Sequence, residues 1–180
     1  DSFDEINAVI HGTTVGTNAL LERKGAATGI ITTAGFADVL EMRRRDRPNT
    51  WGLWGDFVPI VERDMRLEVA ERTGADGTIV QEVDQAEVTA QAQALLAAGA
   101  EACCIAFINS YANDQNERLA FEAVKLVWPN DHITSSAELL PEVREFERTS
   151  TATINAYLQP VVGDYIERLE LALTDGGFAG

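Results

Sequence analysis

The residues best suited to chemistry lie near the start of the chain, in the run His11-Gly12-Thr13-Thr14-Val15-Gly16-Thr17. A short apolar stretch ends at His11, and a stretch of good helix formers follows Thr17, so the pattern predicts a strand, a polar turn and a helix. The carboxyl end of a parallel strand is where α/β folds bind ligands. We therefore treat this turn as the candidate functional site.

The chemistry that this turn can support is the binding of negative charge. The first amides of a helix have no partner within the helix and carry the positive end of its dipole, which suits a phosphate, a carboxylate or a developing oxyanion. Gly12 lets a ligand approach the backbone, and three threonines add hydroxyl donors. The candidate catalytic residues are His11, Thr13 and Thr14, and the candidate cofactor-binding residues are Gly12, Thr13, Thr14 and Thr17.

A purely structural interpretation of the same residues stays open. Thr14 or Thr17 can simply cap the helix, and His11 can be a hydrogen-bonded core residue. Two well-known nucleotide motifs are excluded, because the glycines do not follow G-x-G-x-x-G spacing and no G-K-[ST] follows them.

The stretch from His11 to Ala26 resembles the HGTT-x-x-TN-A-L-L-E-R-x-G-A signature of the hydantoinase A/5-oxoprolinase family. The likeness continues in the family's order over nearly the whole chain, in residues 32–41, 66–72 with 76–77, 105–113, 136–151 and 155–160.

The resemblance implies a specific activity. Members of this family use ATP, with Mg²⁺, to phosphorylate the carbonyl oxygen of a cyclic amide such as a hydantoin or 5-oxoproline, which makes the ring hydrolysable. It also implies an A-type subunit that works with a B-type partner. The implied fold is RNase-H-like, as in the actin and sugar-kinase ATPases, with two such domains around a nucleotide cleft.

The resemblance also leads us to expect a partial domain. The family's Gly-Gly-Thr phosphate loop should lie before Asp1, and its second glycine-rich phosphate motif should lie beyond Gly180. We expect residues 1–160 to be an N-terminal α/β domain without its first strands, and residues 161–180 to be a trailing helix and linker. We also expect this piece alone not to hydrolyse ATP, because positioning around the phosphates is most of phosphoryl-transfer catalysis.

The elements that must position the turn alternate between short apolar runs and helical periodicity, which favours an α/β fold with parallel pairing. We expect buried strands at residues 7–11, 27–33, 102–108 and 132–136. We expect helices at residues 16–24, 36–45, 85–98, 114–128, 145–158 and 161–173, with Gly25 ending the first and Pro160 separating the last two. Residues 66–72 and 78–83 should form a β-hairpin across Asp76-Gly77.

The loop from Asp46 to Val61 interrupts this alternation of strands and helices, and it contains Trp51 and Trp54 among prolines and glycines. Aromatic rings of this size carry much apolar area, so we expect the loop to dock on another chain or domain. The alternative is that it folds back on its own domain.

Four arginines, at positions 43, 44, 45 and 47, form the basic cluster of an acidic chain. One interpretation is a solvated helix end that interacts with the helix dipole. The functional alternative is contact with an anion or a partner subunit.

Charge and cysteine content restrict partners and compartment. The formal net charge of −15, spread along the chain, would repel nucleic acid and anionic membranes, and no apolar run reaches the roughly 20 residues that span a bilayer. Cys103 and Cys104 are neighbours in an apolar run, so we expect free, buried thiols in a reducing cytoplasm. We expect no metal site, because His132 has no His or Cys partner at ligand spacing.

Two other functions remain open from the sequence. A subunit of an acetone- or acetophenone-type carboxylase would share this domain and would also activate a carbonyl by phosphorylation. A non-catalytic module that binds a partner through the aromatic loop is the second alternative.

Overall fold

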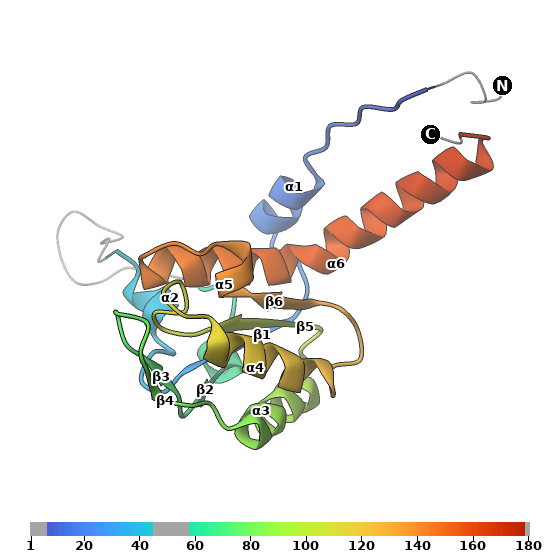
Figure 1. Ribbon diagram of the computed structural model, residues 1–180. Helices are drawn as coiled ribbons and strands as arrows, with labels where there is room; N and C mark the ends of the chain where they lie inside the picture. Colours follow the sequence, from blue (N-terminus) through green and yellow to red (C-terminus); the bar gives the residue numbers. More distant parts are fainter. Residues whose placement is uncertain (1–6, 45–57, 179–180) are drawn as a thin grey trace.

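The central element of the protein is a four-stranded parallel sheet, shown in a computed structural model that describes residues 7–44 and 58–178 (Figure 1). The strands are β1 (Thr28–Thr33), β2 (Arg66–Val69), β5 (Ala102–Ala106) and β6 (Ile133–Ser135), in the order β2-β1-β5-β6. Every neighbouring pair is parallel. The chain therefore crosses over between successive strands of the sheet, as the alternating sequence pattern predicts.

Helices cover both faces of this sheet (Figure 1). Helices α3 (Gln85–Ala97) and α4 (Gln115–Lys125) pack on one face, and α6 (Glu145–Asp175) packs on the other. Side chains alternate along β5, so Cys103 belongs to the core under α3 and α4 while Cys104 belongs to the core under α6. The prediction of free, buried thiols on opposite faces is confirmed.

The predicted β-hairpin is also confirmed. Strands β3 (Arg72–Thr73) and β4 (Ile79–Gln81) pair antiparallel, and Gly77 occupies the turn at φ +82°. The first half of the expected hairpin arm, residues 66–69, belongs instead to the main sheet as β2. The α/β class with a hairpin excursion is therefore correct, with a shorter hairpin than the alternation of residues 66–72 indicates.

The prediction of a buried strand at residues 7–11 is wrong. These residues form no strand and are exposed. Their neighbour in sequence, β1, already has β2 on one side and β5 on the other. An apolar run without a hydrogen-bonding partner strand cannot join a ladder, and in Figure 1 residues 7–14 run beside the second half of α6.

Helix α1 (Val15–Leu21) follows this segment and ends earlier than predicted. Arg23, not Gly25, takes the left-handed conformation after the helix, at φ +56°. The role of Gly25 is close packing, because a Cβ built on it would lie 2.2 Å from Cε1 of Tyr157.

Helix α2 (Val39–Met42) is a single turn, shorter than the predicted 36–45. Arg43 ends it at φ +51°, a conformation that a continuing helix cannot contain. Residues 45–57, with Trp51, Trp54 and two arginines of the basic cluster, lie outside the described residues, so the predicted docking of the aromatic loop stays a prediction.

The predicted break at Pro160 is wrong, because α6 continues from Glu145 to Asp175. A proline inside a helix removes a hydrogen bond to a carbonyl one turn earlier and crowds that region. The carbonyl that lacks its helical donor is that of Ala156. The next carbonyl, of Tyr157, accepts a hydrogen bond from the Ala26 amide at 2.9 Å, which holds this turn of α6 against the segment before β1. The domain boundary that we expect at residue 160 therefore lies within α6, at the point where this helix extends beyond the sheet (Figure 1).

Two short elements complete the described fold. The 3-10 helix η1 (Arg63–Met65) leads into β2, and α5 (Ser136–Leu139) follows β6 directly. Both stand at the ends of the outer strands of the sheet, β2 and β6.

Candidate functional site

The predicted turn is open to solvent in the structure. His11, Gly12, Thr13, Thr14 and Thr17 are all exposed. A Cβ added to Gly12 would meet no atom within 4 Å, so the space beside this backbone is available to a ligand. The exposure agrees with the functional interpretation of the turn and excludes burial of its threonines in apolar packing.

The threonine hydroxyls make short-range contacts at the start of α1. The Val15 amide donates to Oγ1 of Thr13 at 3.2 Å, and the Asn18 side-chain amide donates to Oγ1 of Thr14 at 3.4 Å. Thr14 is the N-cap residue, yet its side chain forms no cap hydrogen bond. The hydroxyls of Thr13 and Thr14 thus accept hydrogen bonds within the turn, and the Thr14 hydroxyl does not cap α1.

His11 is not a core residue. Its Nε2 is hydrogen-bonded to the phenolic oxygen of Tyr165, and the two rings lie with centroids 5.6 Å apart. Tyr165 belongs to the second half of α6, so this contact ties the segment before α1 to that helix. The phenol fixes the orientation of the imidazole at the edge of the turn.

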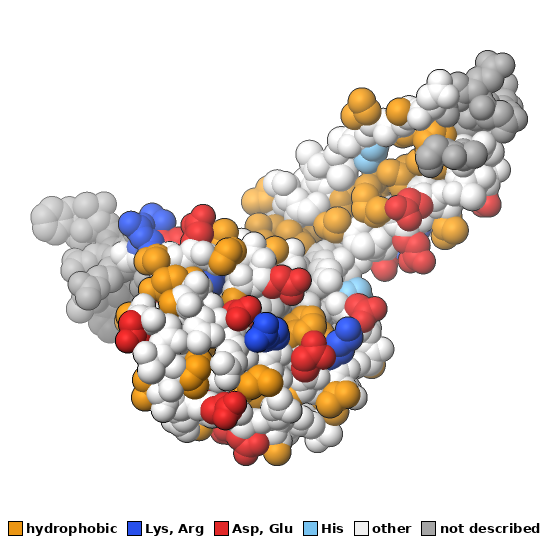
Figure 2. Space-filling model, in the orientation of Figure 1, with side chains coloured by type: hydrophobic (Ala, Val, Ile, Leu, Met, Phe, Trp, Pro, Cys, Tyr) orange, Lys and Arg blue, Asp and Glu red, His pale blue; other side chains and the backbone are white. Residues whose placement is uncertain are grey.

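The turn does not lie at the carboxyl edge of the parallel sheet, contrary to the prediction. Helix α1 packs against α6, and the nearest atom to a Cβ on Gly16 would be Cγ2 of Val162, at 3.6 Å. Figure 2 shows apolar side chains gathered along this arm of the molecule. Ile10 is 99% exposed there, so the arm presents a large apolar surface beside the turn.

The carboxyl edge of the sheet is instead occupied by a buried polar network. At the end of β1, the Thr33 hydroxyl donates to Glu71 Oε1 and accepts from the Ile108 amide at 3.0 Å. The other Glu71 oxygen accepts from the side-chain amide of Asn116 at 2.8 Å. Burial raises the pKa of Glu71 above its ordinary value, while the bonds from Thr33 and Asn116 act in the opposite direction.

A second part of this network surrounds Glu117, which reaches from α4 to the ends of β5 and β6. The carboxylate accepts from two backbone amides, of Phe107 at 3.0 Å and Ala137 at 2.7 Å. It also accepts from the hydroxyls of Ser135 and Ser136, at 2.8 and 3.0 Å. Four donors around one carboxylate satisfy its hydrogen-bonding capacity in a buried position.

Arg148, in the first turns of α6, completes the network from the opposite face of the sheet. Its guanidinium donates to the carbonyls of Phe107 at 2.7 Å and Glu142 at 3.0 Å, to the Ser136 hydroxyl at 3.2 Å, and to the Glu145 carboxylate. The spacing of Arg148 from Glu145 is that of a weak ion pair on a helix surface, but the Arg148 side chain is fully buried. The signal was present: Arg148, Ala152 and Ala156 recur at a spacing of four on one helix face.

The network holds loops in place and shows no nucleophile–base pair. Every oxygen of Glu71 and Glu117 already has a donor, and Arg148 already has four acceptors. Within residues 7–44 and 58–178, no group of three or more His, Cys, Asp or Glu side chains could hold a metal ion. No helix in the described part of the chain is long and apolar enough to cross a bilayer.

Comparison with known proteins places the chain in a family. The model of the hydantoinase/oxoprolinase N-terminal region matches residues 1–127. An uncharacterized protein of Methanocaldococcus jannaschii is 38% identical over 99% of the chain, and the caprolactamase subunit alpha of Pseudomonas jessenii is 33% identical over 93% of it. The chain spans about a quarter of the length of these relatives, 27% and 25% respectively.

Solved structures agree with the sequence comparison. The ATP-dependent caprolactamase of Pseudomonas jessenii superposes with a TM-score of 0.87 at 32% identity, over 97% of this chain and 26% of that one. An acetone carboxylase in its nucleotide-free form superposes with a TM-score of 0.79 at 25% identity, over 91% of this chain and 25% of that one. These neighbours are consistent with the predicted actin/ATPase-like α/β fold. The chain thus belongs to the hydantoinase/oxoprolinase family, of which it carries the N-terminal region.

Proposed function

We propose that this chain is part of an ATP-dependent hydrolase for cyclic amides of the hydantoin, 5-oxoproline or lactam type. One observation carries the proposal: nearly the whole chain superposes on an ATP-dependent caprolactamase with a TM-score of 0.87. The family match over residues 1–127 supports the same assignment.

In this proposal ATP, with Mg²⁺, supplies the phosphoryl group that activates the ring carbonyl. The exposed turn fits a partial contact with such an anion, because the backbone beside Gly12 is open and three exposed threonines follow it in the turn and the start of α1. Thr13, Thr14 and Thr17 would donate hydrogen bonds to phosphate or oxyanion oxygens, with the amides at the start of α1. His11, oriented by Tyr165, would hold or release a proton at the edge of the turn.

The proposal also concerns partners and compartment. We propose a B-type hydantoinase subunit or domain as the partner, and a reducing cytoplasm as the compartment in which Cys103 and Cys104 stay free. The 180-residue chain alone should show no enzyme-specific ATP hydrolysis.

The test uses the complete natural enzyme with its partner. Incubation with ATP and 5-oxoproline, hydantoin or caprolactam, in separate reactions, should give ADP and a ring-opened product in at least one. Thr13→Val and Thr14→Val should lower turnover without changing the thermal midpoint. Unchanged kinetics in both variants would show that these threonines are only helix-start residues, while absence of ring opening with every cyclic amide would contradict the hydrolase assignment.

A second candidate function rests on the acetone carboxylase structure, which superposes with a TM-score of 0.79. A ketone carboxylase would consume bicarbonate and an enolisable ketone with ATP, and would form a new carbon–carbon bond. Product analysis with labelled bicarbonate separates the two functions, because the hydrolase incorporates no label.

A further inference from the structure

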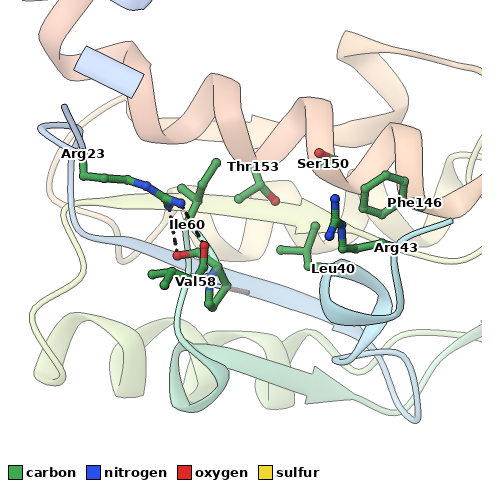
Figure 3. A pocket seen from close by; sticks show the side chains of 9 residues that line it. Arg23, Leu40, Arg43, Val58, Ile60, Phe146, Ser150 and Thr153 are labelled. Carbon is green, nitrogen blue, oxygen red and sulfur yellow. Dashed lines mark hydrogen bonds between the residues drawn. The ribbon is translucent and has the colours of Figure 1, made fainter. Parts of the chain in front are cut away.

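A small cavity on the α6 face of the sheet differs in charge from the rest of the molecule (Figure 3). Its volume is about 220 Å³, and it lies between α6, α2 and the segment that begins at Val58. Its lining consists of Arg23, Leu40, Arg43, Val58, Pro59, Ile60, Phe146, Ser150 and Thr153. None of the residues His11–Thr17 lines the cavity, so the function proposed for that turn does not explain it.

Among the residues that the structure describes, the lining contains two arginines and no acidic residue. The chain as a whole has 29 Asp and Glu against 14 Lys and Arg. The Arg23 end of this cavity is therefore a local positive site on a strongly acidic molecule, and positive clefts concentrate anions.

Arg23 supplies a fixed positive charge at one end of the cavity (Figure 3). Its guanidinium donates to the carbonyl oxygens of Val58 at 2.9 Å and Pro59 at 3.2 Å. Among residues 7–44 and 58–178, no carboxylate forms an ion pair with it. Two of the five guanidinium N–H groups are thus held by neutral acceptors, and the remaining donors and the full charge are available to an anion.

The walls between the two arginines are apolar with one hydroxyl edge. Leu40 and Ile60 lie between Arg23 and Arg43, Phe146 lies beside Arg43, and Ser150 and Thr153 descend from α6 (Figure 3). The Thr153 hydroxyl already donates to the Thr149 carbonyl at 2.7 Å, so the hydroxyl that remains for a ligand is that of Ser150. A volume of about 220 Å³ lies below the range of roughly 300–1,000 Å³ for drug-sized ligands. A compact ligand with an apolar body fits, and a nucleotide does not.

We propose that this cavity binds a small organic carboxylate, whose charged group meets Arg23 and whose hydrocarbon body packs on Leu40, Ile60 and Phe146. The site lies on the α6 side of the sheet, which faces away from α3 and α4. It is independent of the cyclic-amide chemistry proposed above.

The positive lining distinguishes this cavity from a neighbouring one. That cavity shares Arg43 and Phe146 with the first, but its lining includes Asp38 and Glu145. Two carboxylates there would repel an anion. The proposal therefore applies to the Arg23 side only.

The test is calorimetric titration of the purified protein with hexanoate, hexanamide, inorganic phosphate and ATP. Hexanoate should bind saturably at one site, and hexanamide, which lacks the charge, should bind at least about tenfold more weakly, as expected for loss of a charge-assisted hydrogen bond. Equal binding of the two probes, preferred binding of phosphate or ATP, or no hexanoate binding at about 10 mM would overturn the proposal.

Two variants locate the site and one serves as a control. Arg23→Gln should weaken hexanoate binding about tenfold or more, and Ser150→Leu, which narrows the cavity without removing a charge, should do the same. Arg63→Gln removes an equal charge that is paired with Asp38 outside the cavity lining, and should leave the affinity unchanged. Because Arg23 also holds two carbonyls, Ser150→Leu decides the outcome if Arg23→Gln unfolds. Retained affinity in Ser150→Leu would contradict the proposal, and no readout depends on enzyme turnover.

Discussion

Arg148 and Glu117, the two ionisable side chains buried at the ends of β5 and β6, are joined through the hydroxyl of Ser136. Nε of Arg148 donates to this oxygen at 3.2 Å, and the oxygen donates onward to Glu117 Oε2 at 3.0 Å. The same two side chains also bind the backbone of Phe107. Glu117 accepts a hydrogen bond from the Phe107 amide, and Arg148 donates one to the Phe107 carbonyl. Opposite charges from opposite faces of the sheet thus fix the loop after β5.

Removal of the arginine should strongly destabilise the fold. Arg148→Met leaves the backbone carbonyls of Phe107 and Glu142 and the Glu145 carboxylate without this donor, and breaking a buried charge network in this way costs roughly 3–5 kcal/mol. Urea unfolding monitored by far-UV circular dichroism measures the loss. The control is Arg44→Met, which breaks the partly exposed pair with Glu147 and should change the midpoint far less. Similar losses in the two variants would contradict the role assigned to Arg148.

The shared hydroxyl should couple Arg148 to Glu117 energetically. Ser136→Ala removes a donor to Glu117 and an acceptor for Arg148, and should cost about 1–3 kcal/mol by leaving buried groups unsatisfied. In a double-mutant cycle with Arg148→Met, the two losses should be non-additive by more than about 0.5 kcal/mol. Additive losses would show that the hydroxyl does not transmit the interaction.

Glu71 should make stability fall as the pH rises through the acidic range. Burial raises the folded-state pKa of this carboxyl above the ordinary value of 4.5, so the folded protein binds its proton more tightly than the unfolded chain does. The free energy of unfolding should therefore have its full contribution from this group below pH 4.5 and lose it as the pH rises to the folded pKa. Thr33→Val removes a hydrogen bond that lowers this pKa, so in that variant the loss should extend to higher pH.

Urea midpoints between pH 4 and 7 test this prediction, and Glu71→Gln serves as the comparison because it cannot titrate. After subtraction of the Glu71→Gln profile, the wild-type protein should show a negative slope. A difference that is flat, or that rises with pH, would contradict the proposed protonation.

Sequence pattern predicts the parts of this fold that depend on local preference and burial. Strands β1, β5 and β6 of the parallel sheet, the helix after Asp84 and the turn at Gly77 follow from apolar runs, a capping aspartate and a left-handed glycine. The strand at residues 7–11 was wrong because a strand needs a partner, which no local pattern supplies. The unbroken α6 does not follow from the sequence because a local pattern ends a helix at a proline, whereas the contact of this turn with Ala26, 131 residues away in sequence, is tertiary.

The candidate site also combines features that the local sequence predicts with features that depend on long-range contacts. The exposed turn was predictable from its residue types, while its position beside α6 depends on the long-range contact of His11 with Tyr165. Arg148 and Glu117 resemble surface charges in the sequence, and only their convergence at Ser136 from two faces of the sheet shows that they are buried.

The two cysteines should be protected by burial. Desolvation raises the pKa of the Cys104 thiol to about 12 and that of Cys103 in the same direction, so almost no thiolate forms near neutral pH. Iodoacetamide should modify both residues only as fast as the protein unfolds, and added urea should accelerate the reaction. A Glu22→Cys variant, with a thiol at an exposed position, should react in its native state. Rapid native modification of Cys103 or Cys104 would contradict their burial.

Gly25 should be intolerant of even one added methyl group. A Cβ at this position would lie 2.2–2.4 Å from three ring atoms of Tyr157, which is closer than real contacts allow. The Tyr157 ring is buried and its backbone carbonyl is tied to Ala26, so neither can move away freely. Gly25→Ala should therefore lower the free energy of unfolding by about 1–3 kcal/mol, as overpacking does.

Gly16→Ala is the matched control, because its added Cβ would lie 3.6 Å from Val162, an ordinary contact, within helix α1. Alanine is the better helix former, so this variant should be neutral or slightly stabilising. Combining Gly25→Ala with Tyr157→Leu, which removes the ring, should recover part of the loss attributed to the methyl group. If Gly25→Ala is as stable as Gly16→Ala, or if Tyr157→Leu gives no such recovery, then the contact between Gly25 and the ring does not set the position of the chain between α1 and β1.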